Sequence, residues 1–285
     1  VGDRDQRVRY LFLIQITFLL LMIWGTPIFV EPNARVVDSW THFAESEVIG
    51  QSGRIVVKEA EAYSYNQYPL GFVLGAVTLV VTSVPELSCM RFFPLFSGGI
   101  ILLNYYAWVR SVTADDVSQR LSVVFLVLLN LWLRFHFTPQ TFALMLLPLI
   151  LLTLNGSDVK MRIVTIFLFM SLVVCHPITP LFLATVLCGQ YVLLRIFRIT
   201  TKVSLGLLLV FSTLWIFWFM FNATVYSYSV TLQLVHGLDL ANLQATTVTE
   251  LERHYVIPSV IRLLTLVWAS IVTLGQMVRK REDHR

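Results

Sequence analysis

The sequence predicts an all-α, polytopic integral membrane protein, and three observations support this fold class. Hydrophobic residues make up 56% of the 285 positions, whereas charged residues make up only 13%. A soluble domain cannot bury that much apolar surface. The apolar residues occur in continuous runs, without the alternation of a transmembrane β-barrel, so each run is expected to form a helix. The net charge of +4 is spread over short connecting segments, so we expect no contact with nucleic acid.

About nine hydrophobic segments are expected to form all or part of a membrane-spanning helix, which needs about 20 apolar residues. They cover residues 10–30, 68–84, 92–109, 121–135, 141–154, 163–175, 181–196, 203–222 and 257–278. The long polar stretches between them are a first outer loop, residues 31–67, and a second outer loop, residues 223–256. Residues 1–285 are expected to form a single transmembrane domain, with a candidate active site in the first outer loop.

The basic residues predict the topology. The first segment follows an arginine-rich stub and the last precedes the basic residues 279–281, so both termini are expected in the cytoplasm of a multi-pass cell-membrane protein. Lys160 and Arg162 also favour a cytoplasmic loop. Four full crossings between the first outer loop and this loop would reverse that orientation. We therefore expect one segment between residues 68 and 135 not to cross fully.

The first outer loop begins with a predicted amphipathic helix. Asp38, His42 and Glu45 fall at i, i+4 and i+7 and share one helix face. The other side carries an apolar stripe of Val36, Val37, Trp40, Phe43, Ala44 and Val48. Such a helix is expected to lie on the membrane surface with its polar face in water. A carboxylate beside an imidazole is typical of a general base, so these three are the candidate catalytic residues. The alternative is a solvated helix face without a chemical role.

Polar residues at the ends of other segments are candidates for substrate binding. His136 and His176 each follow a short apolar segment and precede proline and threonine, a pattern typical of a cavity lining within a membrane protein. Arg91 and Arg134 carry the forked guanidinium donors that suit a phosphate. Capping and snorkelling at the membrane interface is the alternative for each residue taken singly. The candidate substrate-binding residues are Tyr65, Tyr68, Arg91, Arg134, His136, Gln140 and His176.

The cysteines do not indicate a metal centre or a disulfide framework. Cys89, Cys175 and Cys188 lie in or beside apolar runs and have no CxxC spacing, so we expect them to be packing residues. The sequence therefore assigns no metal ligands and no cofactor, and a divalent metal stays an open alternative.

The order of these features resembles the GT-C class of polytopic glycosyltransferases, particularly its archaeal members. The first outer loop carries the acid-initiated helix DSWTHFAESEVI and ends in YNQYP before the second segment. MRFFPLFSGG is similar to the arginine-leucine-proline segment of the class, and FTPQTFA and CHPITPLFLA are similar to its outer-facing turns. The likeness covers residues 10–184. Members usually carry more spans or a soluble C-terminal domain, so a truncated, split or inactive relative is one expectation.

The resemblance implies an inverting glycosyltransferase that uses a polyprenyl-phosphate-linked sugar at the outer membrane face. Membrane lipid and a glycan or protein acceptor would be its other partners. Asp38 would be the catalytic base, and Arg91, Arg134 and His176 would contact the donor phosphate or its cavity. A non-catalytic accessory subunit stays open, as does a lipid or solute transporter. The scarcity of charges within the segments and the absence of a clear internal repeat disfavour the transporter.

Overall fold

The computed structural model describes residues 3–34, 38–55, 64–128, 135–156, 158–199 and 201–228, and every regular element in these ranges is helical. The elements are α1 (Asp3–Leu20), the π-helical turn η1 (Leu21–Gly25), α2 (Thr26–Val30), α3 (Asp38–Ser52), the 3-10 turn η2 (Ser64–Gln67), α4 (Leu70–Thr82), α5 (Glu86–Val112), α6 (Asp116–Leu128), α7 (Pro139–Leu154), α8 (Val159–Cys175), α9 (Ile178–Ile196), α10 (Leu205–Phe217) and the π-helical turn η3 (Trp218–Asn222). The all-α prediction is confirmed for the described residues.

Three of the described helices are long and apolar enough to cross a membrane, namely Glu86–Val112, Ile178–Ile196 and Leu205–Asn222. Their apolar side chains are mostly exposed on the protein surface, as in Phe96, Phe182 and Phe217. Exposed apolar surface over helices of this length is unfavourable in water and favourable in lipid. Length and composition therefore identify a membrane protein. The helix Leu70–Thr82 is shorter, and its 13 residues span about 20 Å of a hydrocarbon core about 30 Å thick.

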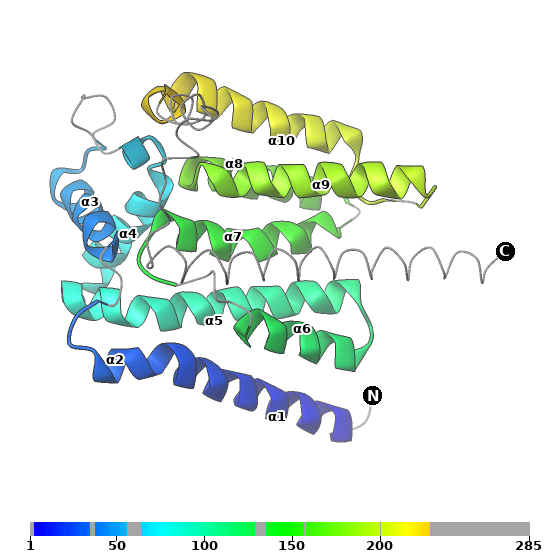
Figure 1. Cartoon of the computed structure of the whole chain (residues 1–285), viewed down its shortest axis with the longest axis horizontal. Helices are drawn as coiled ribbons and strands as arrows, with labels where there is room; N and C mark the ends of the chain where they lie inside the picture. The colour runs from blue at the N-terminus through cyan, green and yellow to red at the C-terminus, as the bar shows by residue number, and fades with distance from the viewer. Residues whose placement is uncertain are drawn as a thin grey trace, which may run out of the picture. The chain divides into compact units, whose positions relative to one another are not determined.

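The helices of the bundle run lengthwise beside one another in the order α1, α5, α7, α8 and α10 (Figure 1). The rings of Phe169 in α8 and Phe211 in α10 stack with their centroids 3.8 Å apart. A second apolar cluster joins α1, α5 and α6 through side chains such as Phe12, Leu102 and Val123. Long helices with continuous apolar faces thus pack as neighbours and leave their connections at the ends of the bundle.

At one of these ends, α3 packs across α4, apart from the parallel array (Figure 1). Gly75 permits this contact, because a Cβ atom there would lie 2.5 Å from Ser46 Oγ and 2.5 Å from Phe137 Cζ. Gly71 likewise lets α4 approach the start of α7, since a Cβ atom there would lie 2.8 Å from the Cα of Pro139. These two glycines place α3, α4 and the start of α7 in direct contact.

The predicted segments leave residues 85–91 and 110–120 as connections, and both connections are shorter in the structure. α5 begins at Glu86, directly after Pro85, so most of the first connection is helical. The polar loop over residues 110–120 reduces to three residues, because α6 begins at Asp116. The carboxylate of Asp115 accepts a hydrogen bond of 2.8 Å from the backbone N–H of Ser118, which stabilises the first turn of α6. Polar residues at these positions begin helices.

Contacts divide the chain into two compact units, residues 1–192 with 200–227 and residues 193–199 with 228–285. The bundle and the site described below belong to the first unit. In the second unit, the backbone N–H of Ile199 donates to the carbonyl of Leu194 over 2.8 Å, just after the end of α9. The predicted last segment, residues 257–278, and most of the second outer loop lie outside the described residues.

Candidate functional site

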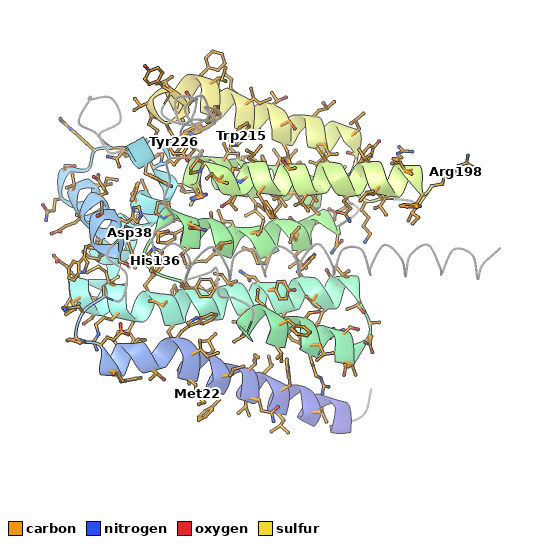
Figure 2. All side chains as sticks on the ribbon, viewed as in Figure 1. Met22, Asp38, His136, Arg198, Trp215 and Tyr226 are labelled. Atoms are coloured by element: carbon orange, nitrogen blue, oxygen red, sulfur yellow. The ribbon has the colours of Figure 1, made fainter. Side chains whose placement is uncertain are left out.

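Polar and aromatic side chains from five separate parts of the chain meet where α3 crosses the bundle. They come from α3, from η2 and the residue that follows it, from the segment before α7, from the α8–α9 junction and from the segment after η3. We call this set the polar cluster; its members are Asp38, His42, Glu45, Tyr65, Asn66, Tyr68, His136, His176 and Tyr226. Figure 2 shows Asp38, His136 and Tyr226 at this same end of the bundle.

Tyr65 is the centre of the polar cluster. Its ring centroid lies 5.9 Å from that of His42, 6.3 Å from that of His176 and 5.8 Å from that of Tyr226. The side chains of Tyr65 and Tyr226 are also hydrogen-bonded to each other. Tyr226 extends the contact to Tyr68, whose centroid is 5.3 Å away. Tyr65, one of the two tyrosines predicted from the sequence, therefore bridges His42 of α3 and His176 of the α8–α9 junction.

Gln67 ties the end of α10 to η2 over a long sequence distance. Its backbone carbonyl accepts a hydrogen bond of 3.1 Å from Trp218 Nε1, and its side-chain Oε1 accepts one of 2.9 Å from the backbone N–H of Tyr226. Trp215 Nε1 donates to the carbonyl of Pro177 over 3.0 Å. Directional bonds of this kind fix residues 215–226 against η2 and the α8–α9 junction.

His176 has a defined tautomer. Its Nδ1 accepts a hydrogen bond of 3.2 Å from the backbone N–H of Thr179, and the hydroxyl of Thr179 lies 2.9 Å from the same atom. An amide N–H can only donate, so Nδ1 is unprotonated and the neutral ring carries its hydrogen on Nε2. Burial, and then the proximity of His42, lowers the pKa of His176 to about 4. This side chain is therefore a neutral hydrogen-bond donor at pH 7, and it caps the first turn of α9.

His42 is buried, which corrects the expectation that it faces water together with Asp38 and Glu45. It is 7% exposed, and the buried face of α3 consists of Ser39, His42, Phe43 and Ser46. Trp40 and Val48 of the predicted apolar stripe are exposed, whereas Phe43 of the same stripe is 2% exposed and packs in the apolar core, so this part of the expectation is wrong. Residues at i and i+4 share a helix face only approximately. The side of α3 that packs on α4 therefore includes the imidazole of His42, while Asp38 stays exposed.

The chemistry of His42 follows from this burial. Burial lowers the pKa of its imidazole to about 4, the carboxylate of Asp38 acts to raise it, and His136 acts to lower it. At pH 7 the ring is therefore neutral, and a ring with so low a pKa is a weak proton acceptor. It can orient a hydroxyl group by hydrogen bonding, but it does not supply a positive charge.

The two acids of α3 have different surroundings. Asp38 is the first residue of α3 and is exposed, and its charge acts on His42 and on Tyr65. Glu45 Oε2 accepts a hydrogen bond of 3.0 Å from Asn66 Nδ2. Glu45 is thus engaged in holding η2 against α3, whereas the Asp38 carboxylate is accessible from solvent as a base.

The tyrosines of the polar cluster are neutral hydroxyl groups. Burial is the largest cause in each case: it raises the pKa of Tyr65, raises that of Tyr68 strongly, and raises that of Tyr226 to about 12. A phenol with a raised pKa keeps its proton at physiological pH and can donate a hydrogen bond. The polar cluster therefore combines one accessible carboxylate with neutral donors and aromatic faces.

The remaining candidate residues make other contacts or lie outside the described residues. Arg91, in α5, donates from Nη2 to the backbone carbonyl of Ile28 in α2. Arg134 lies outside the described residues. Gln140 is in the first turn of α7 with its side chain exposed, and its backbone N–H donates to Thr138 Oγ1 over 3.0 Å. Among the described residues, no group of three or more His, Cys, Asp or Glu side chains could hold a metal ion.

Asn66, Gln67, Trp218 and Tyr226 are not among the candidate site residues predicted from the sequence. Asn66 and Gln67 stand inside the YNQYP stretch, whose polar residues directly before an apolar segment gave a usable signal. Tyr226 and Trp218 stand 151 or more residues after their partner Gln67, and no local pattern indicates such a pairing.

No family model, curated protein or solved structure matches this chain.

Proposed function

We propose that the protein is a multi-pass membrane glycosyltransferase, that it uses a polyprenyl-phosphate-linked sugar, and that the polar cluster is its active site. The observation that supports the proposal is the meeting of Asp38, His42, Tyr65 and His176 at one end of an apolar helical bundle. A substrate with a lipid tail and a polar head would place its head at this position.

The residues of the polar cluster suit a direct displacement. In that reaction the acceptor oxygen bonds to the anomeric carbon, the bond from that carbon to the phosphate oxygen breaks, and the acceptor proton passes to Asp38. Asp38 is the preferred base because its carboxylate is exposed, whereas His42 is neutral and weakly basic. His42 and Tyr65 would orient the acceptor hydroxyl, since placing it behind the anomeric carbon lowers the barrier.

The departing phosphate needs positive charge, which the buried histidines do not provide. His42 and His176 both have a pKa of about 4. His176 would therefore contact a phosphate through its neutral Nε2–H group. The cationic candidates are Arg134, which precedes His136 by two positions in the sequence, and Arg91 in α5. A guanidinium beside the leaving phosphate stabilises the charge that develops during transfer.

The proposed topology places the polar cluster on the outer side and both termini in the cytoplasm, with about nine apolar segments in the membrane. The 13-residue length of α4 supports an incomplete crossing near residues 70–82, because a helix of about 20 Å is shorter than the hydrocarbon core. Cysteine accessibility at Ser52 and Ser111 tests this arrangement; labelling of both positions from the same side contradicts it.

The function is tested by glycan analysis of a host strain that lacks the gene. The strain is complemented with the wild type, with Asp38→Asn or with Glu47→Gln, at equal membrane levels. Glu47 is the matched control because it lies on α3, and its carboxylate pairs with Gln51 of the same helix. A sugar should disappear on deletion, return with the wild type and Glu47→Gln, and stay absent with Asp38→Asn, since loss of a general base costs about 100- to 10,000-fold in rate.

Two outcomes would redirect the proposal. If Asp38→Asn restores the glycan as well as the wild type does, the carboxylate is not the base, and a non-catalytic accessory subunit or a transporter becomes the better description. If deletion alters no glycan or lipid-linked sugar, the glycosyltransferase proposal loses its support.

A further inference from the structure

The hydroxyl of Tyr68 and the side-chain oxygen of Asn66, both in the polar cluster, are buried and lack a hydrogen-bond partner among the described residues. Tyr68 is 1% exposed and Asn66 is 6% exposed. Folded proteins rarely leave such groups unsatisfied, because each loses its hydrogen bonds to water on burial. Two orphan atoms separated by one residue in sequence therefore indicate a partner that binds there.

The orientation of Asn66 is fixed by chemistry. Its amide group donates to the Glu45 carboxylate over 3.0 Å, and a carboxylate can only accept. The atom that faces Glu45 must therefore be Nδ2, and the orphan atom must be the carbonyl Oδ1. Tyr68 has a strongly raised pKa owing to burial, so its hydroxyl keeps its proton. The site thus presents one fixed acceptor, Asn66 Oδ1, and one hydroxyl group that can donate.

We infer that Tyr68 and Asn66 bind hydroxyl groups of an uncharged sugar ring. This inference rests on the proposed function and assigns these two residues to the sugar part of the donor. Asn66 Oδ1 can accept a hydrogen bond from one sugar hydroxyl, and the Tyr68 hydroxyl can donate one to another. The half-buried rings of Tyr65 and Tyr226 lie alongside and offer flat apolar faces for the C–H side of a pyranose.

The charges of the site favour a neutral ring over an acidic one. The polar cluster contains no lysine or arginine, its two buried histidines are neutral at pH 7, and Glu45 and Asp38 contribute negative charge. A uronic acid would bring a carboxylate to a position where no described side chain of the cluster offers a cation, which costs desolvation energy without repayment. A neutral hexose carries no such cost.

The test is a binding experiment on the full chain in lipid nanodiscs. The probes are short-chain polyprenyl-phosphate glucose and mannose, each with its singly deoxygenated analogues. The variants are Tyr68→Phe and, as the matched control, Tyr105→Phe, whose ring packs on Trp108 in α5. Tyr68→Phe should weaken binding of a hydroxylated donor by about threefold to tenfold, while Tyr105→Phe leaves it unchanged.

Two further readouts separate a sugar contact from a structural one. A deoxy analogue that lacks the contacted hydroxyl should bind the wild type more weakly, yet bind Tyr68→Phe as the complete donor does, because the two changes remove the same bond. In the ligand-free protein, Tyr68→Phe should unfold at the same temperature or a higher one, since it deletes a buried hydroxyl that has no partner in the described part of the chain.

Three results would overturn the inference. If Tyr68→Phe binds the donor like the wild type and unfolds at a lower temperature, the hydroxyl serves an ordered water or the fold, and the proposed function stands without this contact. If every deoxy analogue binds both the wild type and Tyr68→Phe more weakly, and by the same factor, other residues bind the hydroxyl groups of the ring. If neither donor binds the wild type or Tyr105→Phe, the proposed function fails and this inference fails with it.

Discussion

Gly75→Ala is the sharpest test of how the site is assembled. A Cβ atom at this position would lie 2.5 Å from Phe137 Cζ, 2.5 Å from Ser46 Oγ and 3.0 Å from Ser46 Cβ. Phe137 is 1% exposed and is packed against Phe43, Phe93 and Phe142. Its ring therefore has no free space to enter. The added methyl group must push α3 away from α4 by about 1 Å to restore ordinary contact distances of about 3.5–4.0 Å.

The magnitude follows from comparison with Gly99→Ala. Gly99 lies in α5, and a Cβ atom there meets nothing within 4 Å. Both variants replace a helical glycine with alanine, so both gain the same helix propensity of about 1 kcal/mol. This gain cancels in the comparison, and the difference between the variants is the overpacking cost of about 1–3 kcal/mol. Gly75→Ala should therefore be the less stable variant by that amount.

Stability is measured on purified protein in detergent, by denaturant titration followed through tryptophan fluorescence. Transfer activity adds a second readout, because His42 lies one helical turn before Ser46, and a displacement of about 1 Å at a reacting group costs up to about 100-fold in rate. Ser46→Ala in the Gly75→Ala chain removes one of the two clashes and should recover part of the stability. Equal unfolding midpoints for Gly75→Ala and Gly99→Ala would refute the packing of α3 on α4 described here.

Three further predictions concern the junctions of the polar cluster. His176→Ala should lose about 1 kcal/mol of stability through the missing cap on α9, and His176→Asn should retain most of it, as measured by thermal unfolding. Below pH 6.5 the unfolded chain binds protons that the folded chain, with His42 and His176 at pKa values of about 4, does not. Stability should therefore fall as the pH drops from 6.5 to about 4, and His42→Gln should flatten this profile. Gln67→Met should raise the KM for the donor more than it lowers kcat, because Tyr226 loses a hydrogen bond outside the reacting atoms.

The sequence located most of the helical segments correctly because continuous apolar runs have few structural alternatives in a membrane. Its errors lie at helix starts and at His42. Glu86 and Asp116 were assigned to loops, since polar residues resemble loop composition; in the structure they occupy first helical turns, where their charge is favourable. The helical period alone could not decide whether His42 faces water, because that depends on which side of α3 packs on α4.

The candidate site was predictable only in part. The i, i+4 spacing of Asp38 and His42 and the polar YNQYP stretch are local features, and local features can be found from the sequence. The contacts of Tyr65 with His176 and of Gln67 with Tyr226 join positions far apart in the chain. They depend on how separate helices pack together, which no composition or helical period encodes.

The sequence by itself therefore determined that this is a membrane protein, where most of its helices lie and which residue types are available for chemistry, because these follow from hydropathy and local spacing. The tertiary structure alone decided which polar groups are buried, which tautomer His176 adopts and which hydrogen-bonding atoms of Tyr68 and Asn66 lack a partner among the described residues. These properties depend on the neighbours that each side chain acquires when separate helices pack together, and burial and partners set both the pKa and the energetic cost of a polar group.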